Sequence, residues 1–248
     1  MNKIVAYSLF ALGILLTLAS VFYEQMIMAF VGLGLTFWGG LLLYITPSKH
    51  VPLELLTAAT TSILANIEKM ITDSNLTGKG IYLPPKYLKD FESSLVFIPS
   101  RANQSLPMGT YEAKLYSGNP SGMFLTPPGM ALSKLFEKEL GTTFTRTDLN
   151  YLQSNLPKLL IEDLEIAETT DVKIEKNTVT ITITNHIFNE VCRETRKLQR
   201  IHGSMGCILS SGIACALAKA TGKPVIIEKE EQSQNEKTTK IQYQILEG

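Results

Sequence analysis

The sequence predicts an α+β protein in which a transmembrane helical hairpin is followed by a cytoplasmic mixed domain. Three observations carry this prediction: two long uncharged runs near the amino terminus, alternating and helical periodicities over the rest of the chain, and a β-β-α-α-β-β order at the end. We divide the 248 residues into a hairpin over 1–48, an amphipathic helix with a mixed segment over 49–170, and a C-terminal unit over 171–248.

The two uncharged runs extend from Ile4 to Tyr23 and from Met26 to Ile45. Each has the ~20 apolar positions that a helix rising ~1.5 Å per residue needs to cross ~30 Å of hydrocarbon. Only Glu24 and Gln25 separate them, which leaves room for little except a tight turn between antiparallel helices. The runs therefore predict a membrane hairpin.

The charges beside the spans predict their orientation. Lys3 precedes the first span, and Lys49 and His50 follow the second, whereas the turn carries no base. On the positive-inside rule we expect a cell-membrane protein with two spans and both termini in the cytoplasm. A cleaved signal peptide is the alternative, but the second apolar run follows the first at once.

Small residues on the second span predict close helix packing. Gly32, Thr36 and Gly40 recur every four residues, a row that lets another helix approach closely within lipid. We expect the first span to be the partner, and a homo-oligomer or a second membrane protein is the alternative. Neither span holds an ionisable residue, so we do not expect the hairpin to transport ions.

The middle of the chain has mixed periodicity. Leu53–Thr72 predicts an amphipathic helix that packs on the domain, although it could also lie on the membrane. The other predicted elements are strands over 80–85 and 95–99 with a brief helix over 86–92, a hairpin from 110–116 and 122–126, a helix over 130–140 closed by Gly141, and a broken or kinked helix over 148–166 at Pro157.

The C-terminal unit has the clearest pattern. Apolar residues alternate with threonine over 179–184, which predicts a strand paired with 172–174. A helix is expected over 186–198, with Asn185 as its N-cap, and a loop around His202-Gly203-Ser204 follows. Residues 205–221 contain so few polar side chains that they predict a buried helix, and strands over 225–229 and 240–246 complete the unit.

The small-residue helix through Gly206-Cys207-Ile208-Leu209-Ser210-Ser211, ending at Gly222-Lys223-Pro224-Val225, resembles the closing part of the vinyl-reductase-like small-molecule-binding domains. The resemblance implies a small-ligand site. Those domains commonly carry cysteines after this helix, and residues 228–248 have none. As a whole, with its paired N-terminal spans, the chain resembles a family of archaeal membrane-anchored proteins.

Charge and cysteine content limit the possible functions. Twenty-three basic and 23 acidic side chains give a formal net charge of zero, so no overall field favours a nucleic-acid partner. Cys192, Cys207 and Cys215 are odd in number, and their spacing is unlike a disulfide framework. We therefore expect three free, buried thiols, in agreement with a reducing cytoplasm.

Candidate site residues gather around the start of the buried helix. Gly203, Ser204, Gly206 and Cys207 could bind an anionic ligand through backbone N–H groups, although the glycines could merely permit a tight turn. Cys207 and His202 are the candidate catalytic pair, as a thiol near a helix N-terminus and a base. The spacing of His186, Cys192, His202 and Cys207 matches no standard metal site, so we expect no metal, and the cofactor is unknown.

A basic cluster precedes that region. Arg193, Arg196, Lys197 and Arg200 could meet anionic lipid on the cytoplasmic leaflet. Glu190 and Glu194 lie among them, which is typical of an ordinary solvated helix face.

These patterns lead to three functional hypotheses. The first is a membrane-anchored cytoplasmic protein that senses a small ligand or docks a partner without catalysis. The second is a membrane-associated enzyme that uses Cys207 and His202, and the third is a structural membrane scaffold. The expected partners are the lipid bilayer, a small ligand or membrane protein, and a second copy of the chain.

Overall fold

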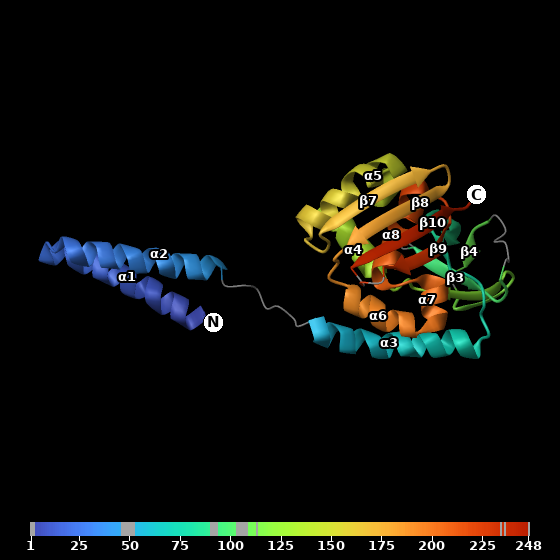
Figure 1. Cartoon of the computed structure of the whole chain (residues 1–248), viewed down its shortest axis with the longest axis horizontal. Coiled ribbons are helices and arrows are strands. Elements are labelled where there is room, and N and C mark those ends of the chain that lie inside the picture. Colours follow the sequence, from blue (N-terminus) through green and yellow to red (C-terminus); the bar gives the residue numbers. More distant parts are fainter. Residues whose placement is uncertain are drawn as a thin grey trace. The chain divides into compact units, whose positions relative to one another are not determined.

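The computed structural model of the chain describes residues 3–45, 53–89, 94–102, 109–112, 114–233, 235 and 237–247. The chain forms two compact units, Met1–Leu55 and Leu56–Gly248 (Figure 1). The fold class is the predicted one, because a pair of apolar helices precedes a mixed α+β domain. Lys49 and His50, on which the predicted orientation depends, lie outside the described residues.

The first unit is an antiparallel pair of helices, α1 (Lys3–Tyr23) and α2 (Met26–Ile45). Both are long and apolar enough to span a membrane. The turn between them is as short as predicted: Glu24 adopts a positive φ of 49°, and the N–H of Gln25 donates to the carbonyl of Ser20 at 3.3 Å.

The two helices touch through small residues. A Cβ built on Gly13 would lie 2.4 Å from the backbone nitrogen of Thr36, and one built on Gly32 would lie 2.6 Å from that of Thr17. Gly39 makes the equally close approach to Phe10, whereas Gly40 meets only the Phe10 ring at 3.6 Å. The predicted packing row therefore contributes Gly32 and Thr36 to the contact between α1 and α2.

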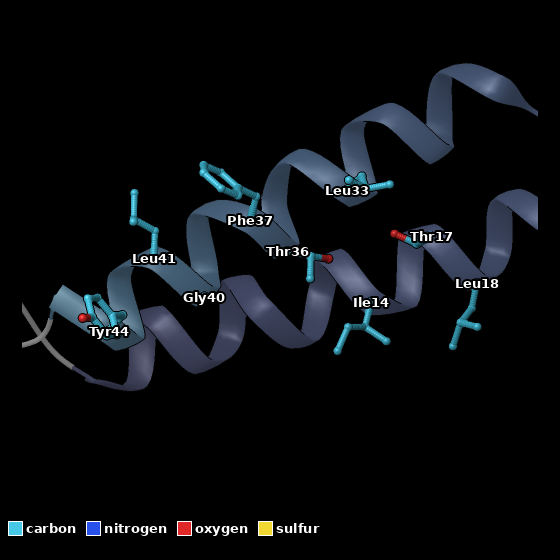
Figure 2. A pocket seen from close by; sticks show the side chains of 9 residues that line it. All are labelled: Ile14, Thr17, Leu18, Leu33, Thr36, Phe37, Gly40, Leu41 and Tyr44. Atoms are coloured by element: carbon cyan, nitrogen blue, oxygen red, sulfur yellow. The ribbon is translucent and has the colours of Figure 1, made fainter.

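An apolar groove runs along the outside of this pair (Figure 2). Its lining residues come from both helices: Ile14, Thr17, Leu18, Leu33, Thr36, Phe37, Gly40, Leu41 and Tyr44. Many of these side chains are exposed in the isolated pair, Leu33 and Phe37 by more than 60%. Such a surface suits a hydrocarbon environment.

The second unit begins with α3 (Leu53–Asp73) and then alternates between strands and helices. Its strands are β1 (Ile81–Leu83), β2 (Leu88–Lys89), β3 (Leu95–Pro99), β4 (Tyr111–Glu112), β5 (Tyr116–Gly118), β6 (Ser121–Leu125), β7 (Thr169–Glu175), β8 (Thr178–Thr184), β9 (Val225–Gln232) and β10 (Thr238–Ile245). Its remaining helices are α4 (Met130–Glu139), α5 (Leu149–Lys158), α6 (Asn189–Lys197), α7 (Gln199–Met205) and α8 (Ile208–Thr221), with short helical turns η1 (Pro85–Tyr87), η2 (Phe144–Arg146) and η3 (Leu159–Asp163).

Eight strands form one antiparallel sheet in the order β5-β6-β3-β1-β9-β10-β8-β7. The middle and C-terminal segments meet where β1 pairs with β9, with Ile81 opposite Ile226 and Tyr82 opposite Val225. Strands β2 and β4 form a separate two-stranded parallel sheet. One sheet therefore contains strands from both the 49–170 segment and the 171–248 segment.

Alternation along the strands separates two hydrophobic clusters. In β1, Tyr82 belongs to the main core beneath the helices, whereas Ile81 and Leu83 belong to a smaller cluster on the other face. In β8, Ile181 and its apolar neighbours join the main core, and the threonines between them face away and are half-buried. The period of two that identified this strand in the sequence thus sets which face meets the helices.

Helix α8 is the centre of the main core, and nearly all of it is buried. It packs closely on α4, where the Gly129 N–H donates to Ser211 Oγ at 3.1 Å. The stretch Gln199–Thr221 is also long and apolar enough to cross a membrane, but most of it is buried inside the domain. The described residues hold no other such stretch besides α1 and α2.

The connection into α8 differs from the prediction. The expected helix over 186–198 begins only at Asn189, because Asn185 adopts a positive φ of 49° and bonds Glu168 instead of capping a helix. The expected loop around His202 is the short helix α7, separated from α6 by a bend at Leu198. The C-terminal order is therefore β-β-α-α-α-β-β.

Candidate functional site

The candidate site lies where α7 meets α8. Gly206 joins the two helices with a positive φ of 67°, a conformation that favours glycine. Cys207 is the extended N-cap residue of α8. A Cβ on Gly206 would lie 2.4 Å from Ser210 Oγ and 3.0 Å from Glu230 Oε2, so glycine also lets a carboxylate approach the amino end of α8.

A β-bulge in β9 turns the Glu230 carboxylate toward the amino end of α8. Lys229 pairs with Gln242, but Ile227 pairs with the next residue, Tyr243, so Glu228 is an extra residue in β9. A bulge reverses which face the following side chains point to. Ile227 and Glu230 consequently point the same way, and the Glu230 side chain is only 4% exposed.

The Glu230 carboxylate is held from several directions. Its Oε2 accepts the N–H of Cys207 at 3.3 Å, at the amino end of α8, where the helix dipole favours negative charge. Burial acts to raise the pKa of Glu230, but hydrogen bonding by His202, Ser210 and the Cys207 amide outweighs it, and the pKa is lowered overall. Glu230 is therefore a buried anion at neutral pH.

His202 is the partly exposed partner of this buried carboxylate. Its Nε2 lies 3.4 Å from Glu230 Oε1, and its side chain is 22% exposed. Neither of these two atoms makes a well-formed hydrogen bond within the described part of the chain. The pair thus retains hydrogen-bonding capacity for a further group.

The structure corrects the prediction of three free thiols. Cys192 of α6 and Cys207 form a disulfide, with Cα atoms 5.1 Å apart. The bend between α6 and α7 folds the intervening residues back and brings the two cysteines together, which their spacing in the sequence does not reveal. Cys215 is free and buried, and burial raises its pKa to about 12.

Helix α7 is clamped by segments far away in the sequence. The Glu68 carboxylate of α3 accepts the backbone N–H groups of Arg200 at 3.0 Å and Ile201 at 2.8 Å. At the other end of α7, the Tyr82 hydroxyl donates to the carbonyl of Met205 at 2.5 Å. These contacts connect α3 and β1 to the start of α8.

The residues predicted to bind an anion divide between two environments. Ser204 is buried in α7, and its Oγ donates to the carbonyl of Arg200 at 2.7 Å. Gly203 is exposed, and a Cβ built on it would meet no neighbouring atom within 4 Å. At Gly206 and Cys207 the carboxylate of Glu230 holds the place that we expected for an external anion.

The predicted catalytic pair is close in the sequence, but Cys207 is in the disulfide and carries no thiol in this form. His202 faces Glu230. Among the residues that the structure describes, no group of three or more His, Cys, Asp or Glu side chains is arranged to hold a metal ion.

The basic cluster is largely balanced by its surroundings. Arg193 pairs with Glu190 at 3.3 Å, and Lys197 pairs with Glu194 at 2.8 Å. Arg196 is half-buried and bonds Gln232 at the end of β9, whereas Arg200 is exposed. The contact of this basic cluster with lipid stays a prediction.

Sequence reasoning missed Glu230 and Glu68. Glu230 lies in the run Glu228-Lys229-Glu230-Glu231, which is typical of an exposed strand end, and only the bulge turns it inward. Glu68 lies within the predicted amphipathic helix over 53–72, where a glutamate is typical of the polar face, and nothing local indicates its distant partner.

A family comparison covers nearly the whole chain. The profile of the family described as "Domain of unknown function (DUF7982)" matches residues 2–244. The chain belongs to this family. The match includes α1 and α2 as well as the mixed domain, so the helix pair is part of what defines DUF7982. No curated protein and no solved structure matches the chain, and the resemblance to vinyl-reductase-like domains stays a prediction.

Proposed function

We propose that the protein is a membrane-anchored, non-catalytic sensor whose mixed domain lies in the cytoplasm and binds a small polar ligand at the Glu230–His202 pair. The observation that carries the proposal is the buried Glu230 carboxylate, turned inward by the bulge in β9, whose Oε1 lies 3.4 Å from His202 Nε2 without a well-formed hydrogen bond to any described residue. Bulges often re-aim side chains at functional sites. Leaving a buried polar atom unpaired costs ~1–3 kcal/mol, which a ligand could recover.

The chemistry of the pair indicates the kind of ligand. A carboxylate accepts hydrogen bonds, and the partly exposed His202 ring offers a second polar group beside it. The exposed Gly203 leaves space on the same turn. A small molecule with a hydrogen-bond donor, such as an amine or amide, fits this arrangement.

Native mass spectrometry of the full chain in detergent tests the proposal. We expect a small molecule to copurify with the wild-type protein and to be lost from the Glu230→Gln variant. Glu231→Gln is the matched control, because the Glu231 side chain is half exposed and pairs with Lys229 on the surface. A clean apo mass for the wild-type chain, with defined oligomers, would favour the scaffold hypothesis instead.

The location needs a separate test. α1 and α2 support anchoring, and the flanking charges in the sequence support a cytoplasmic domain. Protease added to sealed right-side-out vesicles should leave the mixed domain intact, and digestion should require permeabilisation. Digestion without permeabilisation would place the domain outside the cell.

A further inference from the structure

We propose that Cys192 and Cys207 are a reversible thiol–disulfide pair, and that its reduction loosens the contact between α3 and α7. One step of the inference, that a disulfide in a reducing compartment is redox-active, rests on the proposed cytoplasmic location. Its other steps come from the position of the disulfide around α7 and from the contacts that clamp this helix.

The disulfide encloses one structural unit. Its sequence separation is 15 residues, and the enclosed segment contains the end of α6 and the whole of α7. The amino end of α7 is the part that Glu68 of α3 caps with two hydrogen bonds. Any change in the freedom of the enclosed segment therefore acts on the helix that immediately follows the membrane pair in the sequence.

The domain has little need of this bond as a structural staple. The main core already joins α8 to the sheet through large buried side chains such as Tyr82, Tyr243 and Phe136. Staples are typical of small secreted domains that cannot build such a core. Cytoplasmic disulfides, when they occur, are usually transient and catalytic or redox-sensing.

The surroundings of Cys207 suit a released thiol. Cys207 is the N-cap of α8, where the helix dipole stabilises a thiolate, and Ser210 Oγ lies 3.6 Å from its sulfur. Glu230 opposes this effect by placing a negative charge nearby. Cys215, deep in α8 and without a partner sulfur, provides an internal reference that should stay unreactive.

The reaction is an exchange with a dithiol reductant. A thiolate of the reductant attacks one cysteine sulfur, so that the S–S bond breaks and the other cysteine leaves as a thiolate. The second thiol of the reductant then releases the first cysteine and closes the reductant's own disulfide. Two electrons and two protons pass to the protein, which ends with thiols at Cys192 and Cys207. Both sulfurs belong to residues only 1% exposed, so α6 must open locally for the attack.

The test uses the full chain in detergent, equilibrated with mixtures of reduced and oxidised dithiothreitol. Alkylation followed by mass spectrometry counts free thiols, and hydrogen exchange reports on residues 57–73 of α3 and 199–205 of α7. We expect Cys192 and Cys207 to become reactive together while the domain stays folded. Exchange in α7, which the loop encloses, should rise by about 10- to 150-fold, the upper value being the loop-closure effect for such a segment, and exchange in α3 should rise with it.

Three results would overturn the proposal. Alkylation of both cysteines under oxidising conditions would show that they do not pair, and reduction only in the presence of urea would make the bond a structural staple. Reduction without faster hydrogen exchange in α3 and α7 would show that the disulfide does not affect the contact between these two helices. The Cys215→Ser variant is the control: it should have one free thiol fewer, and otherwise show the same reduction and the same change in hydrogen exchange as the wild-type protein. Because ligand copurification does not depend on thiols, the proposed function and this inference can fail separately.

Discussion

The contact between α4 and α8 gives the sharpest test of the fold, because two glycines face each other across it with very different clearance. A Cβ on Gly129 would lie 2.0 Å from the backbone nitrogen and 2.5 Å from the Cα of Gly212, and 2.3 Å from the carbonyl oxygen of Ile208. These are backbone atoms of a buried helix, so no side-chain rotation relieves the overlap. Gly129→Ala must therefore push α4 and α8 apart.

The magnitude follows from two losses. Overpacking in a close-packed core costs ~1–3 kcal/mol, and separation of the helices also removes the hydrogen bond from the Gly129 N–H to Ser211 Oγ, worth ~1 kcal/mol. Gly129 has a φ of −91°, so alanine adds no backbone strain. We expect Gly129→Ala to lower the free energy of unfolding by about 2–4 kcal/mol.

Gly212→Ala makes the same chemical change on the other side of the contact. Its Cβ would meet Gly129 O at 3.1 Å and Leu132 Cδ2 at 3.3 Å, which needs shifts of only a few tenths of an ångström. Alanine also has a better helix propensity than glycine by ~1 kcal/mol. We therefore expect the stability of Gly212→Ala to lie within about 1 kcal/mol of the wild-type value.

Urea unfolding of the full chain in detergent measures both effects. Tyrosine near-ultraviolet circular dichroism suits the mixed domain, because Tyr82 and Tyr243 are fully buried there, whereas Trp38 lies in α2. With a slope of ~2 kcal/mol per molar urea, the Gly129→Ala midpoint should fall by about 1–2 M. Equal midpoints for the two alanine variants would refute the described contact between α4 and α8.

Three further predictions concern buried polar groups. Burial lowers the pKa of His186 to about 4, so the unfolded chain takes up the proton at a higher pH than the folded one. The wild-type domain should therefore lose stability as pH falls from about 6.5 to about 4. His186→Gln should flatten the dependence of the free energy of unfolding on pH over this range. Lys219→Met should cost about 3 kcal/mol, the lower end of the range for a buried pair, because it leaves the largely buried carboxylate of Glu137, 2.9 Å away, without its cation. Tyr82→Phe should cost ~1–2 kcal/mol in urea unfolding through the unpaired carbonyl of Met205.

Each of these three predictions has a result that would contradict it. For His186, a slope that persists in the glutamine variant would assign the titration to another group. For Lys219, the double variant with Glu137→Gln should recover most of the loss, and a neutral single variant would contradict a buried ion pair. For Tyr82, stability unchanged within error would mean that the Met205 carbonyl finds another donor.

Local patterns were sufficient where each element carries its own signal. The uncharged runs predicted α1 and α2 because a membrane span needs only length and apolar composition. Threonine alternation predicted β8, and Gly141, with its positive φ of 63°, marked the end of α4. These signals are contained within a few consecutive residues, and the structure confirms the elements.

The candidate site was harder because distant residues create it. α7 contains Gly203, a poor helix former, and its amino end is completed by Glu68 from more than one hundred residues earlier. Glu230 is buried because a bulge in β9 changes the strand's register against β10. Neither effect follows from local composition, and the same holds for the pairing of Cys192 with Cys207.

The pairing of β1 with β9 also constrains when the domain can fold. During synthesis, β1, β3 and β6 emerge well before β9, so one edge of β1 stays without its neighbour until the last part of the chain leaves the ribosome. An open strand edge is a template for aggregation. Chains truncated before Val225 should accumulate as aggregates, and a chaperone that shields this edge would be needed longest by the nascent domain.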